Sequence, residues 1–244
     1  MKLLVLALVL IASPASAQFA SDQDRREAWQ HYRAGQEFMS AEEFEKAAAA
    51  FHRSIDKDRF LTLAHYGLGQ AYMSLRRYAS AIQAFTNCRE TFRALHGLSE
   101  RDRVAVERQR DEEVRELRDT VRRLQRMNGA RTYELRITKV EVRIEELERQ
   151  RTSNNGVFTP PAEVSLSLGS AYFRNGDMPA AEREWKAATD ANPKLGEAHN
   201  NLAALYATTG RKNEAQTSIR AAERSGFKVN PKLKDDVRNL PSAQ

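Results

Sequence analysis

The sequence contains few of the residues on which several fold classes depend. Among its 244 residues are one cysteine, 11 glycines and 7 prolines. A single cysteine excludes an intrachain disulfide framework and a zinc site of four cysteines. So few glycines and prolines argue against an all-β fold, which needs many tight turns. No apolar run after residue 17 is long enough to cross a bilayer, so we expect no transmembrane segment beyond that point.

The sequence also lacks the short motifs that mark common catalytic sites. It has no glycine-rich phosphate loop, no H-E-x-x-H helix and no G-x-S-x-G turn. Cys88 has no obvious base placed beside it, so we expect a buried filler rather than a nucleophile. We therefore predict that the protein is not an enzyme and needs no cofactor.

The composition is that of a folded protein. Hydrophobic residues make up 41% of the chain and charged residues 30%, and the formal net charge is +6. The apolar content is too high and the charge bias too small for a wholly disordered chain. The length suits one or two domains.

Residues 1–17 have the pattern of a secretory signal peptide. Lys2 provides the positive start, and residues 3–12 are an apolar run about half as long as a membrane span needs. Pro14 breaks this run, and residues 15–17 have the small-x-small form of a cleavage site. The pattern predicts an exported protein whose mature chain begins near Gln18, in the periplasm or, alternatively, secreted.

A sequence pattern recurs along the chain at a spacing of 34 residues. Residues 31–40 read HYRAGQEFMS, and residues 65–74 read HYGLGQAYMS. A third and a fourth copy repeat the order of small and aromatic residues. In each copy an aromatic residue follows a small residue by three positions, so that both lie on one face of a helix. These pairs are Gly35–Phe38, Gly69–Tyr72, Gly169–Tyr172 and Ala203–Tyr206.

This pattern resembles the tetratricopeptide repeat, whose unit is a pair of antiparallel helices. The resemblance implies an all-α helix-turn-helix solenoid of four repeats, in which Phe51, Phe85 and Trp185 fill the space between units. Two repeats alone are marginal, so we expect the two pairs of repeats to stack on each other. We assign repeats 1 and 2 to residues 18–97, repeats 3 and 4 to residues 158–226, and a C-terminal capping helix and tail to residues 227–244.

Residues 98–157 interrupt the repeats with a highly charged segment. Apolar residues recur every three or four positions from Val114 to Leu124 and again from Tyr133 to Leu147, and Asn128-Gly129 between them is a turn signal. This predicts a long antiparallel coiled-coil hairpin that projects from the solenoid. It could serve as an arm for docking, as a contact for homo-oligomerisation, or as a rigid spacer. Acidic residues alternate with the arginines, so we expect no nucleic-acid binding, which needs clustered positive charge.

In tetratricopeptide repeat proteins the first helices of the repeats line a concave groove, where peptides or partner helices bind. The resemblance implies such a groove here, with tyrosine, glutamine and methionine at the same places in repeats 1 and 2. Alternatively, the tyrosines and methionines pack against the neighbouring helix or against the hairpin. The protein-binding residues expected from their position are Trp29, Tyr32, Gln36, Met39, Leu63, Tyr66, Gln70, Met73, Leu166, Phe173, Arg174 and Asn200.

Three histidines occupy equivalent places in different repeats: His31, His65 and His199. Successive repeats would hold them about one unit apart rather than around one ion, so we expect packing roles and no metal site.

Together these patterns predict a non-catalytic adaptor or scaffold of the cell envelope that binds a protein or peptide partner in its groove. Two alternatives stay open. The protein could be structural and self-associate through the hairpin, or it could be an accessory subunit of an envelope enzyme.

Overall fold

The computed structural model describes residues 20–96, 100–126, 130–152 and 160–241. The predicted signal peptide and the Asn128-Gly129 turn lie outside these ranges. Within them the chain is helical and has no strand, and no helix combines the length and apolar character needed to cross a bilayer. The helices are α1 (Asp22–Ser40), α2 (Phe44–Lys57), α3 (Thr62–Ser74), α4 (Tyr78–His96), α5 (Glu100–Arg126), α6 (Ala130–Thr152), α7 (Ala162–Arg174), α8 (Met178–Ala191), α9 (Gly196–Thr208), α10 (Lys212–Arg224) and α11 (Pro231–Asn239).

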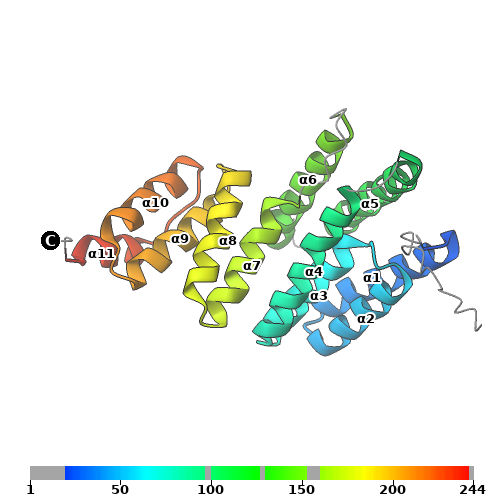
Figure 1. Cartoon of the computed structure of the whole chain (residues 1–244), viewed down its shortest axis with the longest axis horizontal. Helices are drawn as coiled ribbons and strands as arrows, with labels where there is room; N and C mark the ends of the chain where they lie inside the picture. Colours follow the sequence, from blue (N-terminus) through cyan, green and yellow to red (C-terminus); the bar gives the residue numbers. More distant parts are fainter. Residues whose placement is uncertain (1–19, 97–99, 127–129, 153–159, 242–244) are drawn as a thin grey trace, which may run out of the picture.

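The repeats form one elongated row of helices, with α1 and α2 at one end and α11 at the other (Figure 1). Helices α1–α4 form repeats 1 and 2, and α7–α10 form repeats 3 and 4. Helices α5 and α6 extend to one side of this row. The all-α tetratricopeptide solenoid predicted from the 34-residue pattern is therefore confirmed.

The same turn joins the two helices of every repeat. The backbone N–H of the residue before the second helix donates to the carbonyl of the aromatic position in the first, as Asp177 does to Tyr172 at 3.0 Å and Arg211 to Tyr206 at 2.8 Å. Such a turn places one residue in the left-handed region, where glycine is favoured. Repeats 3 and 4 have Gly176 and Gly210 there, whereas repeats 1 and 2 have Glu42 and Arg76, with φ of 59° and 58°.

Small residues let the helices of one repeat approach each other. A Cβ atom on Gly69 would lie 2.5 Å from the ring of Phe85, and one on Gly169 would lie 2.5 Å from Trp185. The Phe51 ring meets two glycines, Gly35 in its own repeat and Gly67 in the next. These rings therefore fill space that only a missing side chain leaves open.

Repeats 2 and 3 stack directly on each other, although the α5–α6 pair separates them in the sequence. Phe85 of α4 packs against Leu168 of α7, and Phe92 of α4 packs against Val164. Arg89 of α4 donates to both carboxylate oxygens of Glu184 in α8, at 2.8 and 3.0 Å. The expected stacking of the two pairs of repeats is thus present, and the solenoid is continuous.

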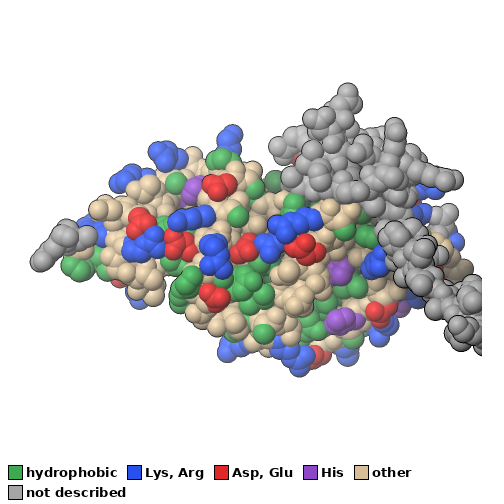
Figure 2. Space-filling model, in the orientation of Figure 1, with side chains coloured by type: hydrophobic (Ala, Val, Ile, Leu, Met, Phe, Trp, Pro, Cys, Tyr) green, Lys and Arg blue, Asp and Glu red, His purple; other side chains and the backbone are tan. Residues whose placement is uncertain are grey.

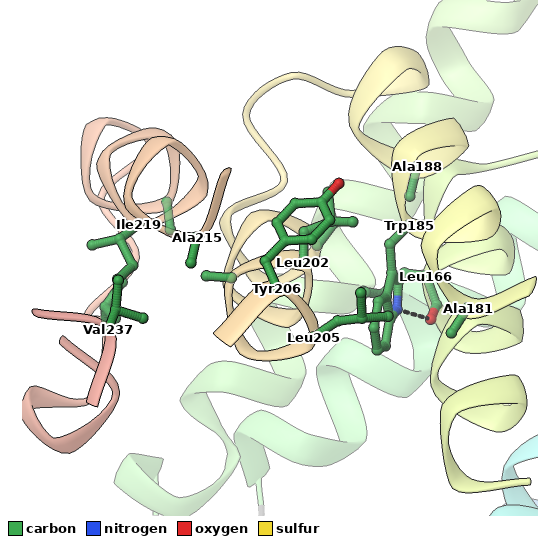
Figure 3. Close-up of a cluster of buried hydrophobic side chains, with 14 residues drawn as sticks. Leu166, Ala181, Trp185, Ala188, Leu202, Leu205, Tyr206, Ala215, Ile219 and Val237 are labelled. Atoms are coloured by element: carbon green, nitrogen blue, oxygen red, sulfur yellow. Dashed lines mark hydrogen bonds between the residues drawn. The ribbon is translucent and has the colours of Figure 1, made fainter. Parts of the chain in front are cut away.

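The core of repeats 3 and 4 extends to the C-terminal end of the row. Trp185 lies among Leu166, Leu202 and Leu205, and its indole N–H donates to the Leu166 carbonyl at 3.1 Å (Figure 3). Helix α11 adds Val237, which is 1% exposed, to this cluster. Helix α11 therefore covers apolar side chains of α9 and α10 at this end of the row.

Candidate protein-binding surface

The residues predicted to bind a partner lie on the first helices of the repeats. We call this side of α1, α3, α7 and α9 the inner face. Its predicted residues differ widely in exposure. Trp29, Tyr32 and Leu166 are buried; Gln36, Met39, Leu63, Tyr66, Met73, Phe173 and Asn200 are half-buried; Gln70 and Arg174 are exposed.

Tyr32 and Trp29 pack within repeat 1. Their rings meet edge to face with centroids 5.4 Å apart, and Tyr32 also lies 5.8 Å from Phe51. The Tyr32 hydroxyl accepts a hydrogen bond from Gln36 Nε2 at 3.2 Å. Burial, together with the nearby carboxylates of Glu113 and Glu116, raises the pKa of Tyr32 above its usual range. In this arrangement Tyr32 is a packing residue, which is the alternative that the sequence left open.

Tyr66, at the equivalent place in repeat 2, joins two repeats. Its hydroxyl lies 2.9 Å from the Ser167 hydroxyl of α7, and its ring lies 5.4 Å from Phe85. Burial raises the pKa of Tyr66 to about 12. The repeated Tyr–Gln–Met stripe therefore contributes one tyrosine to the stack between repeats, while Gln70 remains exposed.

The α5–α6 pair lies against the inner face of repeat 1. Arg33 of α1 donates to Glu116 at 3.1 Å, and Arg25 Nε lies 3.9 Å from Glu112 Oε2. From α6, Arg136 donates to Ser40 at 3.1 Å and to Gln36 at 3.3 Å.

Apolar contact joins the same pair of helices to repeat 2. Leu117 and Val121 of α5 cluster with Ile144 of α6, and Leu63 of α3 packs against this cluster. The pair was expected to project from the solenoid, and this expectation is wrong for the part that contacts α1 and α3. It fails because one side of α5 carries carboxylates that pair with arginines of α1. Whether the two helices form a regular coiled coil stays a prediction.

A buried ion pair anchors α6 near the end of α4. Arg143 donates to Glu113 at 3.2 Å, and its guanidinium lies 5.3 Å from the centre of the Phe92 ring. Glu113 is 6% exposed. A cation over an aromatic face is attracted to it, more strongly where water is excluded.

Over repeats 3 and 4 the inner face carries an aromatic ring, an amide and small side chains at half-buried positions. The Phe173 ring packs on Trp185 at 5.5 Å between centroids but remains half-buried. Asn200, Ala204 and Ala207 of α9 are also half-buried, and Arg174 is exposed. This stretch offers one aromatic ring, one amide and one guanidinium within two adjacent helices.

Among the described residues, the face of the row seen in Figure 2 shows no comparable concentration of one kind of side chain. In Figure 2 acidic and basic side chains are interspersed over the face of the row, with hydrophobic side chains between them. Within the described ranges the exposed large hydrophobic residue is Val142 of α6.

Two of the repeated histidines have a structural role that the sequence did not reveal. His65 Nε2 lies 2.9 Å from the Arg59 carbonyl, and His199 Nε2 lies 3.0 Å from the Pro193 carbonyl. Each thus ties the start of a first helix to the loop six residues before it. Among the described residues, no group of three His, Cys, Asp or Glu side chains could hold a metal ion.

Cys88 is 1% exposed, and its thiol lies 3.5 Å from the Thr62 carbonyl. Burial raises the pKa of this thiol to about 12. A thiol that stays protonated and covered is a poor nucleophile, in line with the packing role expected for it.

The residues that sequence reasoning missed are those that hold α5 and α6 in place: Arg25 and Arg33 of α1, Glu112 and Glu116 of α5, and Arg136 of α6. One signal was available in the sequence. Glu112, Glu113 and Glu116 gather on one side of an otherwise arginine-rich helix, and such a face favours a basic partner surface.

Comparisons with known proteins agree with this architecture. Residues 32–87 and 166–226 match the family model described as tetratricopeptide repeat. The crystal structure of MamA is similar, with a TM-score of 0.52 and 14% identity over 84% of this chain and 80% of that chain.

Two other solved structures are more distant. The crystal structure of TTC0263, a thermophilic TPR protein of Thermus thermophilus, has a TM-score of 0.36 and 18% identity over 87% of this chain and 98% of that chain. The crystal structure of YrrB, a TPR protein with an unusual peptide-binding site, has a TM-score of 0.31 and 17% identity over 90% of this chain and 94% of that chain. The search of curated proteins found no match. The helix pairs of α1–α4 and α7–α10 are therefore tetratricopeptide repeats, as their 34-residue period, their helix–turn–helix form and the matching family model agree.

Proposed function

We propose that this protein is a non-catalytic adaptor that holds a segment of a partner protein on the inner face of α7 and α9. The observation that carries the proposal is the difference between the two halves of this face. Helices α5 and α6 contact the inner face of repeat 1, whereas Phe173, Asn200, Ala204 and Ala207 stay half-exposed.

The chemistry of this open stretch suits a peptide segment. The Phe173 ring offers an apolar surface of fixed orientation, because it packs against the Trp185 ring. The Asn200 amide can pair with a peptide backbone through both its oxygen and its nitrogen. The small side chains of Ala204 and Ala207 leave room for a helix or an extended strand to approach α9 closely.

We further propose that the adaptor works in the cell envelope, in the periplasm or outside the cell. The support for this location is the pattern of residues 1–17. Mass spectrometry of the protein from its native cells should give a mature N-terminus near Gln18. An intact residue 1 on the bulk of the protein would contradict export.

Site-specific photocrosslinking tests the proposed binding surface. A benzophenone amino acid at Ala204 on the inner face is compared with one at Lys186 of α8, whose side chain is 54% exposed on the outer helix. We expect a crosslinked partner from position 204 and not from position 186. The variant Phe173→Ala, Asn200→Ala should reduce this product at least severalfold without changing helicity.

The identity of the crosslinked species decides between this proposal and its alternatives. A second copy of the chain would favour the self-associating structural protein. An enzyme whose activity changes on binding would favour the accessory subunit. Equal products from both positions, or none from position 204, would contradict binding on this surface.

A further inference from the structure

We propose that the inner face of α1 is a binding site for an acidic helix of a partner protein, and that α5 occupies this site until such a helix displaces it. This inference rests on the proposed function, because it names the class of partner for another stretch of the same inner face. It also assigns a regulatory role to the α5–α6 pair.

The contacts between α1 and α5 define what the site recognises. Arg33 binds Glu116 at 3.1 Å, and Arg25 lies near Glu112. Glu112 and Glu116 are four residues apart and so lie on one side of α5. Leu117 follows Glu116 and packs in the cluster that contacts Leu63 of α3. A partner helix that carries Glu-x-x-x-Glu-Leu would therefore present the same groups to the same side chains.

The contact between α1 and the α5–α6 pair is polar, unlike the contacts between repeats. Ion pairs and side-chain hydrogen bonds from Arg33 and Arg136 join the pair to α1. By contrast, α4 and α7 meet through Phe85, Leu168, Phe92 and Val164. Glu116 is buried beside Arg33, whose side chain is 41% exposed, so removal of α5 is costly unless another carboxylate takes the place of Glu116. A competing helix with equivalent carboxylates supplies that replacement, so it can take the place of α5 on α1.

The solenoid does not depend on the α5–α6 pair for its continuity. Repeats 2 and 3 pack directly on each other, and Arg89 and Glu184 bind across their junction. Movement of α5 away from α1 would leave these contacts intact. Arg143 and Glu113 bind each other within the pair, so its two helices would move together, and this movement would also open the contacts with Phe92 and Leu63.

A peptide of residues 107–126 is the probe for this site, because it carries the carboxylates of α5 in their own sequence. Its binding to the full mature chain is measured by fluorescence anisotropy. The chain variant Glu112→Gln, Glu116→Gln removes the two carboxylates of α5 that face Arg25 and Arg33, and so weakens the binding of α5 to α1. The matched control, Glu134→Gln, Glu141→Gln, removes two carboxylates from exposed positions of α6.

We expect the peptide to bind the Glu112→Gln, Glu116→Gln chain at least tenfold more tightly than the wild-type chain or the control. Adding Arg33→Ala to that chain should return its affinity for the peptide to the wild-type value. A peptide that carries Glu112→Gln and Glu116→Gln should likewise bind that chain no more tightly than the wild-type chain binds the original peptide. Equal affinity for all of these chains would overturn the proposal. Circular dichroism confirms that each variant retains its helicity.

A distance measurement tests displacement in the wild-type chain. Spin labels are placed at two exposed positions, Glu37→Cys in α1 and Thr138→Cys in α6, while Cys88 stays buried and unlabelled. Saturating peptide should lengthen the distance between the labels. An unchanged distance at saturation would overturn displacement.

The two proposals fail separately. Loss of the crosslink at position 204 with intact peptide binding would count against the proposed function alone. Loss of peptide binding with an intact crosslink would count against the acidic-helix site alone.

Discussion

At the scale of single residues, equivalent positions of the repeats carry different chemistry. The left-handed turn position is glycine in repeats 3 and 4 but Glu42 and Arg76 in repeats 1 and 2. The repeated tyrosine packs inside repeat 1 as Tyr32 and joins two repeats as Tyr66. The repeat thus sets a backbone position, and the neighbouring helices decide what the side chain does there.

The first prediction concerns the backbone at Arg76. Arg76→Gly should stabilise the fold by about 0.5–1 kcal/mol, because a side chain at positive φ is strained and Arg76 is exposed. Gly176→Ala should destabilise the fold by a similar amount, because that position has φ of 88°. No atom lies within 4 Å of the added Cβ, so backbone strain accounts for the whole effect. Urea unfolding of both variants checks this. A loss of stability in Arg76→Gly would contradict it.

The second prediction concerns the pH dependence of His65. Burial lowers the pKa of His65, and its Nδ1 is buried without a hydrogen-bond partner. The unfolded chain takes up a proton near pH 6.5 while the folded imidazole stays neutral. The contribution of the neutral His65 to the free energy of unfolding is therefore fully present above that pH and is lost as the pH falls below it.

His65→Gln keeps a donor for the Arg59 carbonyl but removes the titration. We expect its urea midpoint to change less between pH 7.5 and 5.5 than that of the wild-type chain. His199→Gln, which alters the equivalent contact with Pro193, is the matched control. The same pH dependence in wild type and His65→Gln would assign the effect to other groups.

At the scale of helices, close approach depends on pairing a small residue with a large one. In repeats 1 to 3 the small residue is glycine, and an aromatic ring occupies the space that it leaves. In repeat 4 the small residue is Ala203, and Ile219 replaces the aromatic ring. A smaller side chain on the second helix thus accompanies the added Cβ atom on the first.

The third prediction follows from this pairing. Gly69→Ala should destabilise the protein by about 1–3 kcal/mol, because the new Cβ would lie 2.5 Å from the Phe85 ring in a packed core. Combining it with Phe85→Ile should cost less than the two separate losses added together. Urea unfolding of the single and double variants measures this coupling, and strict additivity would contradict it.

At the scale of the whole molecule, one continuous stack carries a charged helix pair on its side. The junction of α4 and α7 is apolar and is reinforced by the pair of Arg89 and Glu184. The α5–α6 pair is held by polar contacts with α1 and by a smaller apolar cluster with α3. The stack should therefore persist when that pair is removed.

The fourth prediction tests this independence. Replacement of residues 99–151 by a short flexible linker should leave a chain that unfolds in one cooperative transition, because four stacked repeats exceed the three that a solenoid needs. Urea unfolding followed by circular dichroism checks this. Two separate transitions would mean that the repeat pairs no longer stack.

The sequence by itself determined the fold class and the four repeats. These features are local, because each depends on residues within one 34-residue unit, and this unit recurs four times along the chain. The tertiary structure alone decided where α5 and α6 lie and which helices of the inner face they contact. Their placement depends on pairs such as Arg33 with Glu116, 83 residues apart. Charged residues recur throughout this part of the sequence, so no local pattern identifies which arginine pairs with which carboxylate.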